Sequence, residues 1–241
     1  MNLSGKNILI TGSARRLGKV FALSVAQLGA TVILHHAHSP EQAEATRMEI
    51  KALGSEAYVL EADLGNLTLV PELIDRSLTY GPLYALVNNA AIFENRDIED
   101  TDLESWQRHL TINLTAPFLL SQAFAAKRNT GEQGRIVNIL DWRALRPGPD
   151  HLPYSVSKAA LAALTRSLAQ ALAPDITVNG LALGAVLPPS TGEATGDIIQ
   201  QVPIKRWAMV DEVAKALIFL LTGPSYITGE IIHVDGGRHL T

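Results

Sequence analysis

Short runs of β-branched and aliphatic residues alternate along this chain with longer segments whose apolar residues recur at helical spacing. The runs that predict strands are 7–11, 31–36, 56–64, 83–90, 135–141, 176–182 and 230–234. The segments that predict helices are 18–29, 39–54, 66–80, 101–128, 154–173 and 211–222. Alternation of this kind implies right-handed crossovers and a mostly parallel sheet covered by helices on both faces. We therefore expect an α/β fold in which 1–241 forms a single doubly wound Rossmann domain with a seven-stranded sheet.

Composition narrows the classes of function. The chain has 241 residues, of which 47% are hydrophobic and 18% charged, which is enough apolar material for one large core. A net charge of −4 argues against a nucleic-acid binder, and the lack of cysteine excludes disulfides, a thiolate nucleophile and a zinc–sulfur site. There is no signal-peptide pattern at the start and no apolar run of about 18 residues that could span a membrane. We expect a cytoplasmic protein with a small-molecule substrate.

The sequence ITGSARRLGKV places a glycine-bearing turn between the first strand and the first helix. The backbone at Gly12 and Gly18 could approach a pyrophosphate at the helix N-terminus, where free N–H groups and the helix dipole favour anions. The alternative is an ordinary strand–helix turn, but dinucleotides bind at the carboxyl ends of such strands.

The second predicted strand ends in LHHAHS and lacks the acidic residue that would bind the ribose 2′-hydroxyl of NAD. With Arg15 and Arg16 in the preceding turn, the local charge favours a 2′-phosphate and hence NADP. The three histidines could instead suggest a metal site, but no carboxylate stands nearby at ligand spacing, and we expect no metal. After the third strand, Asp63 and Leu64 would lie against an adenine or simply cap the strand.

Tyr154 and Lys158 stand one helical turn apart and should share a helix face. An ammonium beside a phenol favours the phenolate, so we expect the pKa of Tyr154 to fall from about 10 and the tyrosine to act as a general acid. The alternative is a solvated helix pair. Asp141, at the end of the preceding strand, and Asn113, midway through the long helix, strengthen the catalytic interpretation.

These motifs together resemble the short-chain dehydrogenase/reductase family over nearly the whole chain. TGSARRLG is similar to the family's TGxxxGxG, with Arg16 in place of the middle glycine; NNAA (88–91) resembles NNAG, and VDGG (234–237) resembles its C-terminal signature. Asn113, Tyr154 and Lys158 match its catalytic residues. We expect NADPH to contact Gly12, Arg15, Arg16, Leu17, Gly18, His36, His38, Ser39, Asp63, Leu64, Asn89, Ala90, Ala91, Tyr154, Lys158 and Gly184.

Asp141 occupies the position of the family's catalytic serine. A serine hydroxyl can donate to a developing alkoxide, whereas a carboxylate suits a substrate with N–H donors or a nitrogen that must be protonated. Together with Arg16, this change resembles pteridine reductases and the related dihydromonapterin and dihydrofolate reductases. Phe93 matches the aromatic that stacks a pterin in that branch, its alternative being a core aromatic. Ala91 and His38 depart from the branch, which has a serine and an arginine there.

The resemblance implies an NADPH-dependent reductase of a pterin-like or dihydropterin C=N bond. Arg16, Phe93, Asp141 and Tyr154 would contact the substrate, while Asp141, Tyr154, Lys158 and Asn113 would be catalytic. The breaker-rich 184–210 would form a lid, and the protein would be a homotetramer or homodimer. Three alternatives stay open: a carbonyl or 3-oxoacyl reductase, a nucleotide-binding regulator without catalysis, and an NAD-dependent dehydrogenase.

Overall fold

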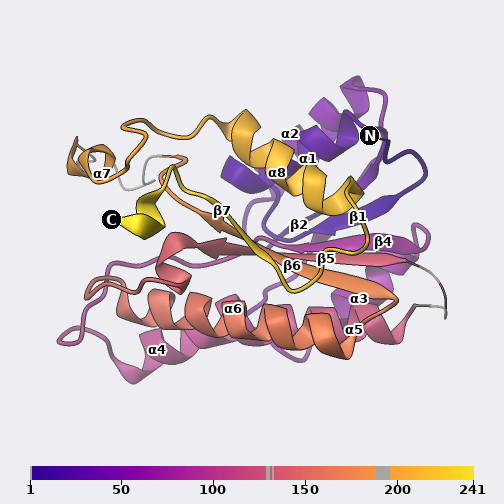
Figure 1. Cartoon of the computed structure of the whole chain (residues 1–241). Coiled ribbons are helices and arrows are strands. Elements are labelled where there is room, and N and C mark those ends of the chain that lie inside the picture. Colours follow the sequence, from indigo (N-terminus) through magenta and orange to yellow (C-terminus); the bar gives the residue numbers. More distant parts are fainter. Residues whose placement is uncertain (1, 129–130, 132, 188–195) are drawn as a thin grey trace.

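The computed structural model describes residues 2–128, 131, 133–187 and 196–241. Within these residues, seven strands form one sheet in the order β3-β2-β1-β4-β5-β6-β7, and all neighbouring strands are parallel (Figure 1). The chain winds from the middle of the sheet to one edge, returns to the middle, and then winds to the other edge. The predicted doubly wound, seven-stranded α/β fold is confirmed.

Every predicted strand and helix is present, with ends that differ by a few residues. The strands are β1 (Asn7–Ile10), β2 (Thr31–His36), β3 (Ala57–Glu61), β4 (Leu83–Asn88), β5 (Gly134–Asp141), β6 (Ile176–Leu183) and β7 (Ile231–Val234). The helices are α1 (Arg16–Ala26), α2 (Pro40–Ala52), α3 (Val70–Leu78), α4 (Leu103–Leu110), α5 (Ala116–Ala126), α6 (Leu152–Ala171), α7 (Gly196–Gln200) and α8 (Val210–Thr222). The long helix predicted over 101–128 is divided into α4 and α5 by a π-helical turn, Thr111–Thr115.

Helices cover the two faces of the sheet in two layers (Figure 1). On one face α1, α2 and α8 pack against apolar strand residues such as Ile8 and Val32. On the other face α3, α5 and α6 pack against residues such as Leu9 and Ile136. Because successive strand residues point to opposite faces, both faces of each central strand are buried, which explains the unbroken apolar runs. No helix in the described part of the chain combines the length and hydropathy needed to cross a membrane.

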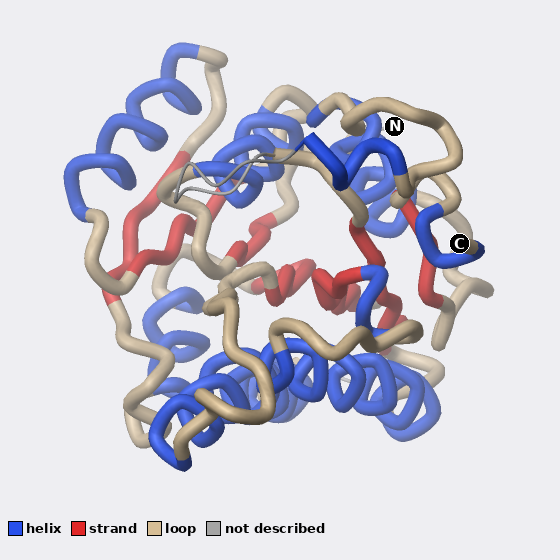
Figure 2. The backbone as a smooth tube through the Cα atoms, turned by 90° about the vertical axis from the view of Figure 1, so that its left-hand side faces the viewer, coloured by secondary structure: helices blue, strands red, loops and turns tan. Residues whose placement is uncertain are grey.

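The carboxyl ends of all seven strands lie on one side of the molecule, which we call the carboxyl edge of the sheet and which faces the viewer in Figure 2. The segments that follow β1, β2, β4, β5 and β6 all leave the sheet at this edge. Parallel strands therefore bring together residues that are far apart in the sequence, and this edge is where such sheets bind ligands.

At the opposite side of the sheet, where the strands begin, the buried Arg135 of β5 links the starts of β4 and β6 to the end of α8. The Arg135 guanidinium donates to Thr177 Oγ1 at 3.1 Å, to the Gly223 carbonyl at 3.0 Å and to Tyr84 Oη at 3.3 Å. Tyr84 Oη in turn donates to the Leu221 carbonyl at 2.7 Å. A cation at a helix C-terminus satisfies carbonyls that the helix leaves without partners and complements the helix dipole.

We expect Arg135→Met to lower the free energy of unfolding by about 2–4 kcal/mol, because these buried acceptors would lose their donor. Urea unfolding followed by circular dichroism measures the change. Arg47→Met is the control, since Arg47 pairs with Glu44 on the surface and its loss should leave the midpoint nearly unchanged. Equal effects of the two substitutions would contradict this role of Arg135.

Candidate active site

The glycine turn after β1 is closely packed against the end of β4. Gly12 has φ +64°, and a Cβ there would lie 2.9 Å from the Ala90 Cα; a Cβ on Gly18 would lie 2.1 Å from the Gly12 carbonyl oxygen. Asn89 Nδ2 donates to the carbonyls of Thr11 and Gly12, at 2.7 and 3.1 Å. Close packing therefore requires glycine at both positions, and Asn89 holds the turn in place.

Arg16 begins α1 in the left-handed region, with φ +52°. Glycine adopts this conformation without cost, whereas other residues do so at about 1–2 kcal/mol. The backbone thus keeps the shape that suits the family's middle glycine, although an arginine occupies the position. Arg15 and Arg16 are both exposed, as is His38 after β2.

The predicted adenosine side of the site is formed by the segments after β2 and β3. His36 is buried, and its Nδ1 accepts from the Ser39 N–H at 3.4 Å. Ser39 precedes α2, but its side chain makes no capping hydrogen bond. Asp63 is exposed and its Oδ1 accepts from the Gly65 N–H at 2.8 Å, while Leu64 is buried. The segment from His36 to Ser39 contains no acidic residue.

The carboxyl of Asp141 and the phenol of Tyr154 meet where β5 ends and α6 begins. Tyr154 Oη donates to Asp141 Oδ2 at 3.3 Å, and the Arg143 N–H donates to Asp141 Oδ1 at 2.9 Å. Burial raises the pKa of the Asp141 carboxyl above its usual value, although the Arg143 N–H and guanidinium and the Lys158 ammonium oppose this. The predicted convergence of the carboxyl and the phenol is therefore observed, and the carboxyl holds a proton more readily than an exposed aspartate.

Lys158 lies one turn after Tyr154 on the same face of α6, with Nζ 5.8 Å from the centre of the Tyr154 ring. Its ammonium donates to the Ile139 carbonyl of β5 at 2.7 Å. Burial lowers the pKa of Lys158 from 10.5 to about 8, although the Asp141 charge opposes the shift. The lysine is thus fixed beside the reactive pair by the backbone of the strand that carries Asp141.

The expectation that the pKa of Tyr154 is lowered is wrong for this structure. Burial raises the pKa of Tyr154 well above 10.0, and the neighbouring Asp141 charge raises it further. The helical spacing of Tyr154 and Lys158 is as predicted, but the lysine donates to a carbonyl while the phenol faces a carboxylate. Tyr154 is therefore a protonated phenol, available to donate a proton.

Asn113 lies on the π-helical turn between α4 and α5, a deviation that is common at functional sites. Its Oδ1 accepts from the Ile92 N–H at 2.9 Å and its Nδ2 donates to the Ile92 carbonyl at 3.0 Å and to Ser157 Oγ at 3.1 Å. Asn113 thus links the segment after β4 to α6, next to the tyrosine, as a supporting residue.

Phe93, in the same segment, lies over the reactive pair. It is 49% exposed, and its ring meets the Tyr154 ring edge-on, with centroids 4.7 Å apart. The core alternative for Phe93 is therefore not supported, and an exposed aromatic face stands beside the phenol. Ala91 is exposed two residues earlier.

The comparisons with known proteins identify the family of the chain. Residues 12–239 match the family model described as enoyl-(acyl carrier protein) reductase. The chain belongs to the short-chain dehydrogenase/reductase family. A 3-oxoacyl-[acyl-carrier-protein] reductase of Synechocystis is 35% identical over 240 residues, covering 98% of this chain and 97% of the relative.

Two solved structures are similar to this short-chain dehydrogenase/reductase. One is the FolM alternative dihydrofolate reductase 1 of Brucella canis in complex with NADP, with 33% identity and a TM-score of 0.93, covering 99% of this chain and 96% of that one. The other is a blue fluorescent protein from a metagenomic library in complex with NADPH, with 32% identity and a TM-score of 0.92, covering 99% of both chains.

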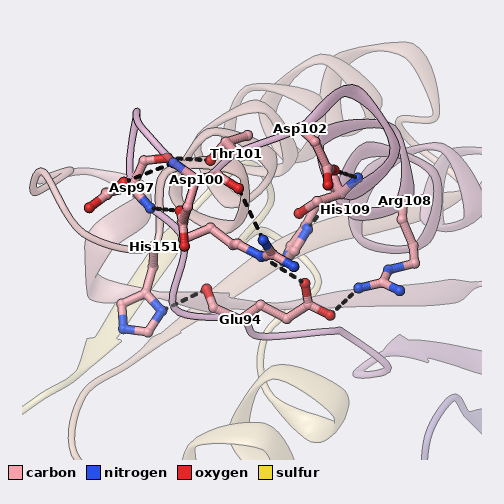
Figure 3. A network of polar contacts seen from close by, with 10 residues as sticks. Glu94, Asp97, Asp100, Thr101, Asp102, Arg108, His109 and His151 are labelled. Atoms are coloured by element: carbon pink, nitrogen blue, oxygen red, sulfur yellow. Dashed lines mark hydrogen bonds and ion pairs between the residues drawn. The ribbon is translucent and has the colours of Figure 1, made fainter.

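Sequence reasoning did not predict the contact of His151 with Phe93, beside the reductase's reactive residues. Its ring stacks on Phe93 with centroids 4.1 Å apart. Its Nδ1 lies 2.9 Å from the Glu94 carbonyl, as Figure 3 shows. Asp150 contacts both His151 and the Arg143 guanidinium, with the Arg143 Nη2–Asp150 Oδ2 distance 2.9 Å. The sequence offers no signal for this stack because it joins two loops that only the fold brings together.

The remaining predicted features lie at the edges of the site. Gly184 follows β6, and a Cβ there would lie 2.6 Å from the Asp235 Cα, so glycine is required by close packing. The predicted lid 184–210 falls partly on 188–195, which lie outside the described residues; its described part contains α7. Across the described ranges, no three His, Asp or Glu side chains gather in a way that could hold a metal.

We expect Gly18→Ala to lower the free energy of unfolding by about 2–3 kcal/mol, because the new Cβ would overlap the backbone of Gly12 and Ser13. Gly54→Ala is the matched control: Gly54 has φ +83° and nothing within 4 Å, so only conformational strain of about 1 kcal/mol applies. Thermal and urea unfolding of both variants measure the difference. A smaller loss for Gly18→Ala than for Gly54→Ala would show that the turn can open.

Proposed function

We propose that the protein is an NADPH-dependent reductase that acts on a pterin-like or dihydropterin C=N bond. The observation that carries the proposal is the partly buried Asp141 carboxyl, hydrogen-bonded to Tyr154 where the family has a serine. A carboxyl that retains a proton can serve a substrate nitrogen, whereas a carboxylate would repel the alkoxide that forms from a ketone. The likeness to the Brucella canis dihydrofolate reductase structure supports the same substrate class.

The residues present fit NADPH at the carboxyl edge of the sheet. Gly12 and Gly18 leave two positions without side chains around the start of α1, where a pyrophosphate binds favourably. Arg15 and Arg16 are exposed beside a strand end that has no acidic residue, which suits a 2′-phosphate. Bound NADPH would supply the hydride, and Lys158 would hold its ribose.

The protein's own part in the reaction is to position the substrate and supply a proton. Phe93 is half-exposed, and a flat heterocycle would stack on the face of its ring opposite His151. Arg16 would contact the same substrate from the glycine turn. Tyr154 would donate its proton to the substrate nitrogen, and Asp141, 3.3 Å from the phenol, would restore it. Lys158 keeps a positive charge beside the phenol as its proton leaves.

A second candidate is an NADP-dependent 3-oxoacyl reductase. The observation in its favour is the 35% identity to the Synechocystis 3-oxoacyl-[acyl-carrier-protein] reductase over nearly the whole of both chains. Both candidates use the same fold and the same Asn113, Tyr154 and Lys158, so they differ in the substrate and in the parts given to Arg16, Phe93 and Asp141.

Cofactor oxidation followed by absorbance separates the candidates. We would offer dihydrobiopterin, dihydrofolate, a 3-oxoacyl thioester and simple ketones, each with NADPH and with NADH. A dihydropterin should give a kcat/KM at least about tenfold above any ketone or thioester, because a site built to pair with nitrogen groups discriminates strongly. Turnover of the thioester without dihydropterin activity would replace the proposal by the second candidate.

The lowered pKa of Lys158 leads to a pH prediction. We expect kcat/KM for NADPH, which reports the free enzyme, to fall above about pH 8 as the Lys158 ammonium loses its proton. Tyr154 stays protonated in this range because its pKa lies well above 10.0. A loss of stability on deprotonation of Lys158 would not explain the fall. Because the pKa of Lys158 is lower in the folded protein than in the unfolded chain, its contribution to the free energy of unfolding rises between about pH 8 and 10.5.

The control for this profile is Lys158→Arg, whose guanidinium keeps its charge throughout. The fall in kcat/KM should then move to higher pH, even if the absolute rate is lower. An unchanged high-pH limb in the variant would show that another group causes the decline.

A further inference from the structure

His35 is a buried residue near the end of β2 that the expected cofactor contacts do not include, although its neighbours His36 and His38 are among them. It is 2% exposed, so its ring does not reach a ligand at the surface. Its position is nevertheless central, because it lies between the glycine turn after β1 and the segment after β3.

The backbone N–H and carbonyl of His35 each form a hydrogen bond with Ser13 of the glycine turn. The Ser13 N–H donates to the His35 carbonyl and the His35 N–H donates to Ser13 Oγ, each at 3.0 Å. Ser13 Oγ also donates to the Ile10 carbonyl at 2.7 Å, so the serine is fixed on both sides.

The imidazole adds two more hydrogen bonds in opposite directions. The Gly12 N–H donates to His35 Nδ1 at 3.0 Å, and His35 Nε2 lies 3.0 Å from the Ala62 carbonyl. Since a backbone N–H can only donate and a carbonyl can only accept, the ring must carry its proton on Nε2 and leave Nδ1 free to accept. Burial lowers the pKa of His35 to about 4, which keeps the ring in this neutral form near pH 7.

The ring therefore connects the two parts of the sheet edge that a dinucleotide would contact. Gly12 belongs to the turn that faces a pyrophosphate, and Ala62 immediately precedes Asp63 and Leu64, where an adenine would lie. The Gly12 N–H is already used by His35, so this group orders the turn and does not bind phosphate itself.

We propose that His35 is a positioning residue that holds the glycine turn in its cofactor-binding shape through the Gly12 N–H and ties it to the end of β3. The proposal rests on the proposed binding of NADPH for its functional consequence, but the structural link is independent of it. A turn that is competent for only a fraction of the time binds its ligand correspondingly more weakly.

Two substitutions separate the two ends of the ring. In His35→Asn the amide oxygen can take the place of Nδ1 and accept from Gly12, but the side chain is too short to reach Ala62. In His35→Gln the amide nitrogen can take the place of Nε2 and donate to Ala62, while the acceptor for Gly12 is lost. Val32→Ala, in the buried core of the same strand, is the control for general destabilisation.

The first measurement needs no cofactor: hydrogen exchange of the amides of 11–18 in the free protein. His35→Gln should speed exchange at Gly12 by about tenfold or more, while His35→Asn should stay within about threefold of the wild type. The second is the Kd for NADPH by fluorescence, which we expect to rise about tenfold in His35→Gln and less than threefold in His35→Asn and Val32→Ala. The kcat at saturating NADPH should change little in all three.

Equal exchange at Gly12 in the Asn and Gln variants would overturn the inference, as would a loss of NADPH affinity in Val32→Ala equal to that in His35→Gln. Failure of the wild type to bind NADPH would refute the proposed function and the functional half of the inference. The exchange measurement would then still decide whether His35 holds the turn.

Discussion

Tyr154→Phe should lower kcat for dihydropterin reduction by about a thousandfold and leave KM within about threefold. The phenol is the donor that lies between the Asp141 carboxyl and the exposed face of Phe93, and a positioned general acid typically contributes about 10²–10⁴ in rate. The ring itself stays, so its packing against Phe93 and the shape of the site should persist. Steady-state kinetics with NADPH and dihydrobiopterin measure the effect.

Two controls keep this result interpretable. Tyr226→Phe removes a hydroxyl from a tyrosine that is 99% exposed, and its rate should equal that of the wild type. Thermal unfolding of Tyr154→Phe should show a loss of only about 1 kcal/mol, the usual contribution of one hydrogen bond. A kcat within about tenfold of the wild type would remove Tyr154 from the role of proton donor.

Asp141→Ser should exchange one substrate class for another. We expect dihydropterin turnover to fall about a hundredfold, because the serine hydroxyl has no proton of suitable acidity to return to Tyr154. Reduction of a ketone or 3-oxoacyl thioester should rise about tenfold, because a donor replaces a negative charge next to the developing alkoxide. The variant should fold, since it removes a carboxyl that burial disfavours in its charged form.

Asp141→Asn is the matched comparison for this exchange. The amide oxygen can still accept from the Arg143 N–H, so the local turn is retained, but the side chain cannot supply a proton. It should lose dihydropterin activity as Asp141→Ser does, because neither side chain can restore a proton to Tyr154. If Asp141→Ser loses all activity with every acceptor, or keeps full dihydropterin activity, the carboxyl does not determine the substrate.

Both experiments depend on how deeply the reactive groups are buried. Burial raises the pKa of both Asp141 and Tyr154, and the Asp141 charge raises the pKa of Tyr154 further. The phenol therefore holds its proton near neutral pH, and the carboxyl takes up a proton more readily than an exposed aspartate. Burial has the opposite effect on Lys158: it lowers the pKa of the ammonium, whose charge therefore changes near pH 8.

The fold could be predicted from the sequence because its signals are local. Each strand is an apolar run such as the one ending at Asp141, each helix has its own periodicity, and parallel order follows from their alternation. The same logic placed Asp141 near Tyr154, since the carboxyl ends of parallel strands lie on one side of the sheet. The need for a residue without a side chain at position 18 was also predictable from the turn.

The tertiary structure alone decided the properties that arise from contacts between distant segments. Spacing along α6 put Lys158 next to Tyr154, but the Ile139 carbonyl takes the ammonium and Asp141 raises the pKa of the phenol, reversing the predicted shift. The stack of His151 on Phe93 and the bridge from Gly12 through His35 to β3 likewise join separate loops. Periodicity and motif spacing describe neighbours along the chain, whereas hydrogen-bond partners and burial depend on what the fold packs against them.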